Sequence, residues 1–529
     1  MRGPIVIAVQ YPKADQMLTV RDSNFIFGTV GTGDVALHIN GVAVPVWPNG
    51  AFMGWLAVPP DSAPRYELLA GNRTETARLV LPIRLPPLPD TTHHEVVTGD
   101  TLNPIVPPAD TLLPIVGKVY VTLGNPASTV NDTDRVTIAM PEPRETGQVY
   151  KWFLFPGTRV RATGTRKLGN AEFVRIELDS SQEAWVQRNE LQGQVTPVTN
   201  STSSLGSPPA APPTPAPAAS VQTMVVGDTV VPLRSVGAVR LQPGSEWTDV
   251  VIPITGPPPP YLVEETDRSI SLLVYGVTAA PVISMMPAPP DNYINSISST
   301  PEPTRVRYTI NLNRPPYGYL VLWQNDTLTF RVRRPPRIAD PANPLRGLTI
   351  TVDPGHPPAG ATGPTGLYEA DAVLPVGLRL RDLLVQRGVN VVMTRTTPDP
   401  VELGLRPIIS RRANAHAFVS IHLDAAPDGQ NPLLTNGSWT LYFWPHSIPL
   451  AMAAQAGLLS EMGLRDKSVR FQNIAVARGT WMPSILTEGA FIIMPDQEAA
   501  LRTPQYQEAY ATAILHGLET YFASLAQTQ

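Results

Sequence analysis

The chain has 529 residues, of which 43% are hydrophobic and 16% are charged, so it is long enough to form several packed domains. Its formal net charge of −4 excludes a protein held to nucleic acid or to an anionic membrane by overall charge. The absence of cysteine excludes disulfides, thiolate metal ligands and a cysteine nucleophile. No apolar run approaches the roughly 18 to 20 residues of a membrane-spanning helix, and the N-terminal apolar stretch is too short for a signal peptide.

Residues 1–112 alternate between apolar and polar side chains, as in "VALHINGVAVPVWPNGAFMGWLAVP". This alternation predicts half-buried β-strands, and the dipeptides Asn40-Gly41 and Asn49-Gly50 predict hairpin turns between them. The segment resembles a bacterial Ig-like β-sandwich. His93 and His94 stand side by side in a polar stretch of this segment, and we interpret them as solvated loop residues rather than a metal site.

Residues 113–195 contain short strands, as in "GTRVRATGTRKLGNAEFVRIELDSSQEAWVQRNEL", and resemble a bacterial SH3-like barrel. Its aromatic and basic side chains could bind a polymer, but core aromatics and solvated charges are the simpler interpretation. These residues are Trp152, Phe153, Arg159, Arg161 and Arg175.

Residues 196–220 include "SPPAAPPTPAPAAS", a composition that cannot bury a core and predicts an extended, semi-rigid linker. Residues 221–336 are again rich in predicted strands and contain two similar parts. Each part has an alternating strand, a proline-rich bend with tyrosine, and two further strands. This segment is similar to the AMIN-type domains that accompany cell-wall amidases.

The pattern changes in residues 346–529, where predicted strands alternate with predicted helices. The segments "LTITV", "VNVVMT", "FVSI" and "SILT" predict buried strands, and apolar spacing predicts helices over residues 370–387 and 506–525. Such alternation is typical of an α/β domain with a mostly parallel sheet and flanking helices. The sequence therefore predicts a multidomain protein in which three all-β modules precede an α/β catalytic domain.

Four side chains with metal-site chemistry fall at the ends of these predicted strands or at a helix start. His356 follows "LTITV", His422 follows "FVSI", Glu488 follows "SILT", and Glu369 opens the first helix. The carboxyl ends of parallel strands share one edge of a sheet, where binding sites collect. Two imidazoles and a carboxylate suit Zn²⁺ with a position open for water, and a further carboxylate could move that water's proton. Singly, each residue also has a structural interpretation, such as a turn cap, a helix start or an ion-pair partner.

The motifs of this segment together resemble a known family. In order they are "TVDPGH", "GLYEADAVL", "VVMTRTTPDPVELGLR", "RRANAHAFVSIHLDA" and "PSILTEGAFIIMPDQEAAL". They are similar to the zinc-dependent N-acetylmuramoyl-L-alanine amidases of the Amidase_3 type. The resemblance implies zinc ligation by His356, Glu369 and His422, with Glu488 as the catalytic glutamate. It also implies a peptidoglycan substrate, cut between the lactyl group of N-acetylmuramic acid and L-alanine.

The chain departs from the family pattern in two places. Pro357-Pro358 stands where the family usually has two glycines, and Leu423-Asp424 follows the third implied ligand in place of small or amide residues. Both changes lie at the rim of the implied site, where they would affect substrate fit more than metal binding. Asp424 is either an acceptor for a ligand imidazole or a surface residue.

Four further residues of this segment have no predicted catalytic role. Arg395 and Arg406 match arginines of the family, and we interpret them as loop anchors that pair with a carboxylate. His416 and His446 have no counterpart in the family pattern, and we interpret them as bystanders.

A peptidoglycan hydrolase acts in the cell envelope, so the resemblance implies export to the periplasm or the cell wall, with the β-modules as positioning or wall-binding units. A protein activator is a possible partner. The alternative is a catalytically inactive or gated wall-binding scaffold, which Pro357-Pro358 favours and the presence of Glu488 disfavours. A zinc peptidase that cuts elsewhere in the stem peptide is disfavoured by the order of the ligands.

Overall fold

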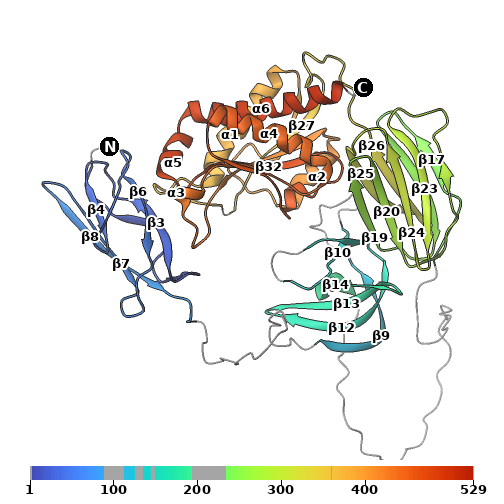
Figure 1. Cartoon of the computed structure of the whole chain (residues 1–529), viewed down its shortest axis with the longest axis horizontal. Helices are drawn as coiled ribbons and strands as arrows, with labels where there is room; N and C mark the ends of the chain where they lie inside the picture. The colour runs from blue at the N-terminus through green and yellow to red at the C-terminus, as the bar shows by residue number, and fades with distance from the viewer. Residues whose placement is uncertain are drawn as a thin grey trace, which may run out of the picture. The chain divides into compact units, whose positions relative to one another are not determined.

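The computed structural model describes residues 3–88, 112–124, 135–144, 149–192, 234–358 and 360–527. His93, His94 and the predicted linker of residues 196–220 lie outside these ranges. A large all-β region precedes a C-terminal domain that contains the long helices (Figure 1). This arrangement agrees with the predicted multidomain protein, in which an all-β region precedes a domain with helices. In the described ranges, no helix is both long enough and apolar enough to span a membrane. Contacts divide the chain into two units, Met1–Thr101 with Pro335–Gln529, and Leu102–Arg334.

The first unit begins with two mostly antiparallel sheets that pack over one core. One sheet has the order β1-β3-β6, with β1 (Ala8–Tyr11), β3 (Ser23–Thr29) and β6 (Ala51–Ala57). The other has the order β2-β8-β7-β4-β5, with β2 (Gln16–Met17), β4 (Ala36–Ile39), β5 (Val42–Val44), β7 (Arg65–Gly71) and β8 (Thr76–Arg84). Strand β2 is the exception, because it is parallel to β8. Both sheets contribute to a shared cluster that includes Ile26, Phe52, Leu37 and Tyr66, so this segment is a β-sandwich. We call it the N-terminal sandwich.

The predicted hairpin at Asn40-Gly41 is present between β4 and β5. Asn40 has φ of 50° and Gly41 has φ of 80°, the left-handed pair that a tight two-residue hairpin turn requires. Asparagine and glycine tolerate this conformation better than other residues, which is why the dipeptide identifies the turn from sequence.

The C-terminal domain of the first unit contains a six-stranded sheet with the order β28-β27-β29-β32-β30-β31. The strands are β27 (Thr349–Pro354), β28 (Asn390–Met393), β29 (Ala417–Asp424), β30 (Ser438–Tyr442), β31 (Asp466–Phe471) and β32 (Ser484–Phe491). Strands β28, β27, β29 and β32 are parallel, whereas β30 pairs with β32 in the antiparallel direction. The carboxyl ends of β27, β29 and β32 therefore meet at one edge, which we call the carboxyl edge.

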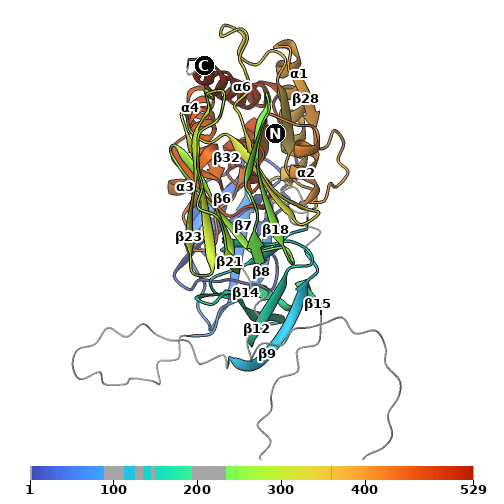
Figure 2. The ribbon, with the colours of Figure 1, turned by 90° about the vertical axis from the view of Figure 1, so that its right-hand side faces the viewer.

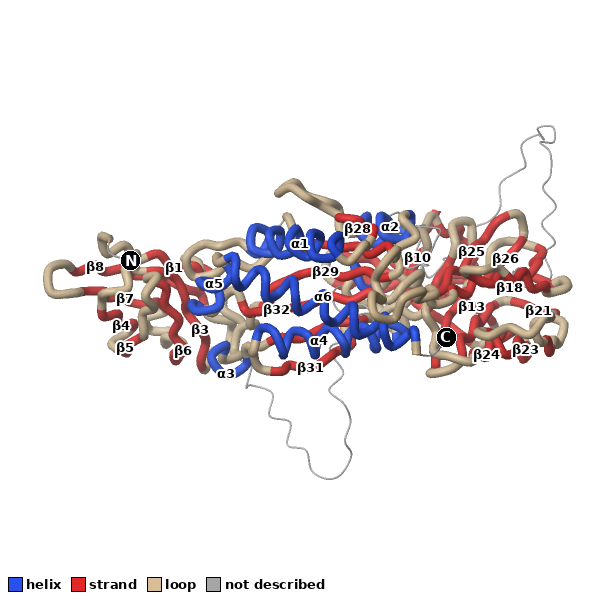
Figure 3. The backbone as a smooth tube through the Cα atoms, turned by 90° about the horizontal axis from the view of Figure 1, so that it is seen from above, coloured by secondary structure: helices blue, strands red, loops and turns tan. Residues whose placement is uncertain are grey.

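Three helices lie side by side along this sheet, namely α1 (Glu369–Gln386), α4 (Ile448–Met462) and α6 (Pro504–Ala526), as Figure 3 shows. The two longer predicted helices are present with boundaries shifted by one or two residues. Gly457 permits the close crossing of α4 and α6, because a Cβ atom there would lie 2.2 Å from the carbonyl oxygen of Ala513. The shorter helices are α2 (Leu405–Arg412), α3 (Pro432–Thr435) and α5 (Pro495–Leu501).

The N-terminal sandwich contacts the C-terminal domain through the loop between β29 and α3. The carboxylate of Asp428 accepts hydrogen bonds from the Tyr11 hydroxyl, from Asn24 Nδ2 at 3.0 Å, and from the backbone nitrogen of Thr19 at 2.8 Å. Asn24 Oδ1 in turn accepts from the backbone nitrogen of Gly429 at 3.2 Å. Because Asn24 is fully buried, this polar contact belongs to the interior of the first unit.

The second unit contains three sheets. A five-stranded sheet has the order β14-β13-β12-β9-β15, with β9 (Leu113–Thr122), β12 (Arg159–Leu168), β13 (Ala171–Asp179), β14 (Gln182–Gln187) and β15 (Leu191–Gln192). A six-stranded sheet has the order β21-β16-β18-β26-β25, with β16 (Arg234–Val236), β18 (Trp247–Thr255), β21 (Val277–Ala279), β25 (Gly318–Gln324) and β26 (Thr327–Arg333), while β17 (Arg240–Pro243) pairs with β18.

The third sheet of this unit has the order β10-β11-β19-β20-β24-β23-β22. Its strands are β10 (Thr137–Ala139), β11 (Trp152–Leu154), β19 (Tyr261–Thr266), β20 (Ser269–Tyr275), β22 (Ser284–Met285), β23 (Ile294–Glu302) and β24 (Arg305–Leu312). Figure 2 shows β23 of this sheet and β18 of the six-stranded sheet in separate layers. Strand β11 pairs with β19 through Phe153 and Tyr261, so two sequence segments on either side of residues 196–220 share one sheet.

The aromatic residues at this junction are structural. Trp152 and Phe153 are each 2% exposed, and Trp152 Nε1 donates to the Tyr275 hydroxyl at 3.1 Å. Their burial agrees with the interpretation of core aromatics and leaves no exposed ring for a polymer at these two positions.

Candidate active site

The four predicted site residues lie at the carboxyl edge of the C-terminal sheet. His356 lies two residues beyond the end of β27, and Glu369 is the first residue of α1. His422 lies within β29 and Glu488 within β32, because both strands run further than the sequence predicts. His422 pairs directly with Glu488 across the parallel strands. The fold thus brings together residues that are up to 132 positions apart in the chain.

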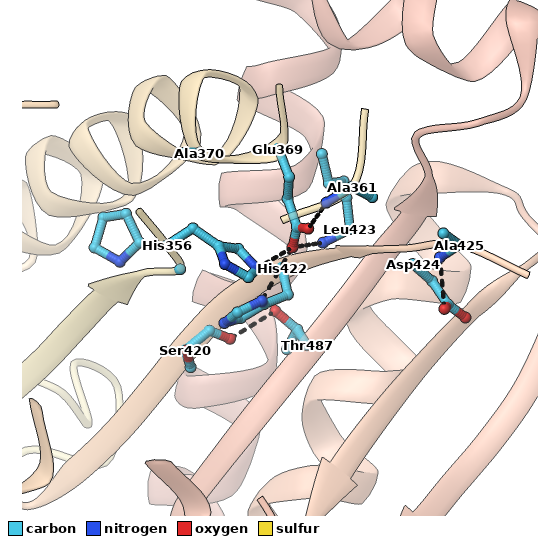
Figure 4. A network of polar contacts seen from close by, with 12 residues as sticks. His356, Ala361, Glu369, Ala370, Ser420, His422, Leu423, Asp424, Ala425 and Thr487 are labelled. Carbon is cyan, nitrogen blue, oxygen red and sulfur yellow. Dashed lines mark hydrogen bonds and ion pairs between the residues drawn. The ribbon is translucent and has the colours of Figure 1, made fainter. Parts of the chain in front are cut away.

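Three of these side chains meet, with two imidazole rings facing one carboxylate oxygen of Glu369 (Figure 4). Glu369 Oε1 lies 3.2 Å from His356 Nε2 and 3.0 Å from His422 Nδ1. One ligand atom from each of the three residues lies within 4.8 Å of the other two, and no further group of this kind occurs among the residues that the structure describes. The three donor atoms are therefore close enough to share one ion.

Backbone groups fix the orientation of the Glu369 carboxylate. Its Oε2 accepts from the nitrogen of Ala361 at 2.9 Å, and its Oε1 accepts from the nitrogen of Leu423 at 3.0 Å. Leu423 directly follows His422, so one strand positions both an imidazole and the carboxylate that faces it. Glu369 is only 3% exposed, and these hydrogen bonds partly compensate the cost of its burial.

The segment that carries His356 is held by two buried arginines. Arg395 donates to the carbonyl oxygen of Gly355 at 2.8 Å, and Arg406 donates to that of His356 at 2.8 Å. These contacts agree with the interpretation of both arginines as loop anchors. Arg406 also pairs with the Asp353 carboxylate through Nη1 at 2.8 Å, but this pair is not bidentate. Gly355 is required here, because a Cβ atom would lie 2.4 Å from the His422 ring.

The two carboxylates of the site have opposite pKa shifts. Burial raises the pKa of Glu369, but the contacts with His356 and His422 outweigh it and hold the pKa well below its usual value. For Glu488, burial and then the charges of Glu369 and Asp424 raise the pKa well above its usual value, against the opposing charge of Lys467. Glu488 Oε2 is buried and has no hydrogen-bond partner among the described residues. The site therefore contains one fixed carboxylate and one unsatisfied carboxyl group.

Asp424 does not bond to an imidazole in this structure. Its Oδ2 lies 2.8 Å from Lys467 Nζ, and both side chains are mostly buried. Sequence reasoning missed Lys467, because nothing in the spacing of "DKSVR" connects it with the histidines. It also missed Tyr510 of α6, whose hydroxyl accepts from the nitrogen of Gly489 at 2.9 Å and donates to the carbonyl of His422 at 3.0 Å. Tyr510 was visible only as part of the apolar stripe of its helix.

The remaining histidines of the domain have other surroundings. His416 Nδ1 accepts from the backbone nitrogen of Thr349 at 3.0 Å, a contact that ties the starts of two neighbouring strands. His446 is buried in the short helix η2 (Pro445–Ser447), and His516 pairs with Glu461 at the surface.

The residues present fit a zinc ion. Two imidazole nitrogens and one carboxylate oxygen form a donor set that Zn²⁺ accepts, and three protein ligands leave a position for water. The unsatisfied Oε2 of Glu488 lies on the strand beside His422, where a water molecule or a substrate group would supply its missing partner. This combination defines the class of the domain: a mostly parallel α/β fold with a candidate mononuclear metal site at its carboxyl edge.

Comparison with known proteins gives the family. A model of the N-acetylmuramoyl-L-alanine amidases, Amidase_3, matches residues 350–520. The Bacillus subtilis protein YqiI is 31% identical over 189 residues, which cover 35% of this chain and 89% of YqiI. Through its C-terminal domain, the chain belongs to the N-acetylmuramoyl-L-alanine amidase family.

Two other relatives carry informative names. The probable cell wall amidase LytH of Staphylococcus epidermidis is 32% identical over 187 residues, and the match covers 35% of this chain but only 61% of LytH. The solved structure of the N-acetylmuramoyl-L-alanine amidase AmiC2 of Nostoc punctiforme is 34% identical, with 33% of this chain and 96% of that chain covered and a TM-score of 0.31.

Proposed function

We propose that the protein is a zinc-dependent peptidoglycan hydrolase that cleaves the amide between the lactyl group of N-acetylmuramic acid and the L-alanine of the stem peptide. The observation that carries this proposal is the convergence of His356, Glu369 and His422, with the unsatisfied Glu488 on the neighbouring strand. The family membership and the similarity to LytH, a probable cell wall amidase, support the choice of substrate.

In this proposal the three converging residues hold the zinc ion. The ion would supply Lewis-acid polarisation of the scissile carbonyl and would lower the pKa of water. His356 and His422 contribute neutral ring nitrogens, while the backbone bonds of Ala361 and Leu423 keep the Glu369 carboxylate aimed at both rings. A fixed carboxylate of this kind gives the site its geometry before substrate arrives.

Glu488 is the proposed general base and general acid. It accepts a proton from the attacking water and passes it to the departing amine of alanine. A carboxyl group with a raised pKa is suited to give the proton back, and its buried Oε2 has no competing partner among the described residues. The lack of a cysteine in the chain is consistent with a route that needs no protein nucleophile.

The β-rich segments before the catalytic domain are proposed to position it on the cell wall. Export to the periplasm or the cell surface follows from the location of the substrate. The relatedness of residues 113–195 to SH3-like barrels and of residues 221–336 to AMIN-type domains stays a prediction, and so does a requirement for a protein activator.

The test uses isolated peptidoglycan and measures newly formed free amino termini of L-alanine. We expect them with the zinc-loaded protein and not with chelated protein or with Glu488→Gln. His516→Ala is the matched control, because it removes a histidine that lies at the surface of the same domain. If the zinc-loaded protein binds the wall but releases no alanine amino termini, the amidase proposal is wrong and the wall-binding scaffold replaces it.

A further inference from the structure

Edge strand β31 brings a lysine to the candidate site. Ser438 of β30 pairs with Asp466 and Thr440 pairs with Val469, so two residues of β31 stand opposite the single residue Trp439. Ser468, the second of these two, has φ of 73°, and its nitrogen donates to Asp466 Oδ1 at 2.7 Å. This bulge redirects the side chain of the other residue, Lys467, over the sheet.

Lys467 is held in place by two aromatic rings and a carboxylate. Its Nζ lies 4.1 Å from the ring centroid of Trp439 and 4.1 Å from that of Phe491. The same atom lies 2.8 Å from Asp424 Oδ2, and the lysine side chain remains 16% exposed. An ammonium group in such a cage is fixed in position, although part of it still faces solvent.

Arg470 adds a second positive charge to the same surface. Its guanidinium carbon lies 5.0 Å from the Trp439 ring centroid, and its Nε donates to the backbone carbonyl of Lys467 at 3.0 Å. Arg470 is exposed, and among the described residues its guanidinium forms no ion pair. Trp439, Lys467 and Arg470 together form what we call the β31 subsite.

The β31 subsite lies close to Glu488. Trp439 pairs directly with Glu488 across β30 and β32, so β31 is two strands away from the proposed catalytic residue. Adjacent strands are about 4.8 Å apart, which places β31 on the order of 10 Å from β32. An extended peptide spans roughly 3.3–3.6 Å per residue, so this distance corresponds to about three residues.

Two positive charges lie on the β31 side of this surface. Lys467 is paired with Asp424, whereas Arg470 forms no ion pair among the described residues. An anionic group of a peptide that reaches β31 is attracted by these cations. A neutral amide in the same position gains much less from the two cations.

We propose that the β31 subsite binds a carboxylate group of the stem peptide, on the second residue from the scissile amide. The inference rests on the proposed amidase function, because it takes Glu488 as the position of the cleaved bond. In cell-wall peptides, the residue after the first alanine carries either a free carboxylate or its amide. Lys467 and Arg470 therefore select the carboxylate form.

The test compares two muramoyl-L-alanyl dipeptides whose second residue carries an amidated γ-carboxyl group, one with a free α-carboxylate on that residue and one with the α-carboxamide. We expect the wild-type protein to cleave the carboxylate form with kcat/KM about tenfold higher, the effect of roughly one charge-assisted hydrogen bond. Arg470→Gln should reduce this preference, and the charge-neutral pair Asp424→Asn with Lys467→Met should reduce it further. The pair is changed together so that neither charge is left buried without a partner.

Arg387→Gln is the control, because it removes one positive charge from the end of α1, where Arg387 pairs with Glu519. Zinc content and thermal unfolding establish that each variant is folded and loaded. Equal cleavage of both peptides by the wild type, or an unchanged preference in the variants, overturns the β31 subsite while the amidase function stands. If neither peptide is cleaved, cleavage of isolated peptidoglycan decides the proposed function, and calorimetric binding of the same two peptides decides the subsite.

Discussion

Two groups of titratable side chains lie within a few residues of each other at the carboxyl edge, and they differ in how completely their polar atoms are paired. In the first, Asp353 is fully buried and accepts from Thr394 Oγ1 at 2.5 Å, Ser420 Oγ at 2.6 Å and Arg406 Nη1 at 2.8 Å. We call these four residues the Asp353 cluster. Every oxygen of its carboxylate has a partner within the protein, which is the arrangement expected of a structural ion pair.

The second group consists of His356, Glu369, His422 and Glu488. Here two imidazoles face one carboxylate oxygen, and Glu488 Oε2 has no partner in the described part of the chain. Such a group costs free energy unless a ligand completes it. The comparison indicates that unsatisfied donors and acceptors, rather than burial of charge as such, separate a candidate site from a structural cluster.

The largest effect is expected at Glu488. Glu488→Gln should lower kcat by about 10²–10⁴-fold, because the amide cannot accept and return a proton. Stability should be unchanged or slightly higher, since the carboxyl group replaced has a buried Oε2 without a hydrogen-bond partner among the described residues. Turnover on peptidoglycan and thermal unfolding measure the two quantities, with Glu461→Gln at the surface as the control. If Glu488→Gln instead lowers the free energy of unfolding substantially, the loss of activity would follow from unfolding, and Glu488 would be a structural residue.

The converse result is expected for the Asp353 cluster. Asp353→Ala leaves the buried Arg406 without its charged partner and should lower the free energy of unfolding by about 3–5 kcal/mol. Denaturant unfolding measures this loss, and Asp399→Ala is an acidic control at an exposed position of the same domain. If the variant keeps its stability but loses zinc, the Asp353 cluster is part of the site and the comparison fails.

Removal of zinc should lower stability only through the group formed by His356, Glu369, His422 and Glu488. At a free zinc concentration of 100 times Kd, binding stabilises the folded state by about 2.7 kcal/mol, and a chelator should remove this stabilisation. His422→Ala lacks one proposed ligand and should show little response to the chelator in thermal unfolding. A response equal to that of the wild type would mean that zinc binds elsewhere.

The positions of the four site residues were accessible from sequence because each depends on local pattern. Apolar runs predict the strands, and His356, His422 and Glu488 come at or just beyond the predicted strand ends. Parallel pairing then brings the strand ends to one edge. The structure places the residues there, while their ligand and catalytic roles remain predictions.

The β31 subsite was not accessible in the same way. Its position beside Glu488 depends on β30 pairing antiparallel to β32, and on a bulge that redirects Lys467. Neither feature has a period or spacing that can be read in the sequence. The contact of Asp428 with Asn24 joins residues 404 positions apart and is likewise a property of the fold alone.

That long-range contact gives the smallest predicted effect. Asp428 is a satisfied carboxylate: burial raises its pKa, but hydrogen bonds from Tyr11, Asn24 and Thr19 outweigh burial and hold the pKa below its usual value. A lowered pKa means that the contact contributes stability above about pH 4 and loses it as the pH falls through the folded-state pKa. Asp428→Asn should therefore cost about 1 kcal/mol at neutral pH, because the carboxylate is only partly buried.

The comparison is sharpest when wild type and Asp428→Asn are unfolded by denaturant at pH 7 and at pH 3. The difference in free energy of unfolding should be present at pH 7 and should shrink at pH 3, because the carboxylate of the unfolded chain, with a pKa of about 3.9, is then mostly protonated. Glu461→Gln again serves as the acidic surface control. A difference that stays constant between the two pH values would show that Asp428 acts through packing of its loop rather than through its charge. The contact between the N-terminal sandwich and the C-terminal domain would then depend on packing, and low pH would not weaken it.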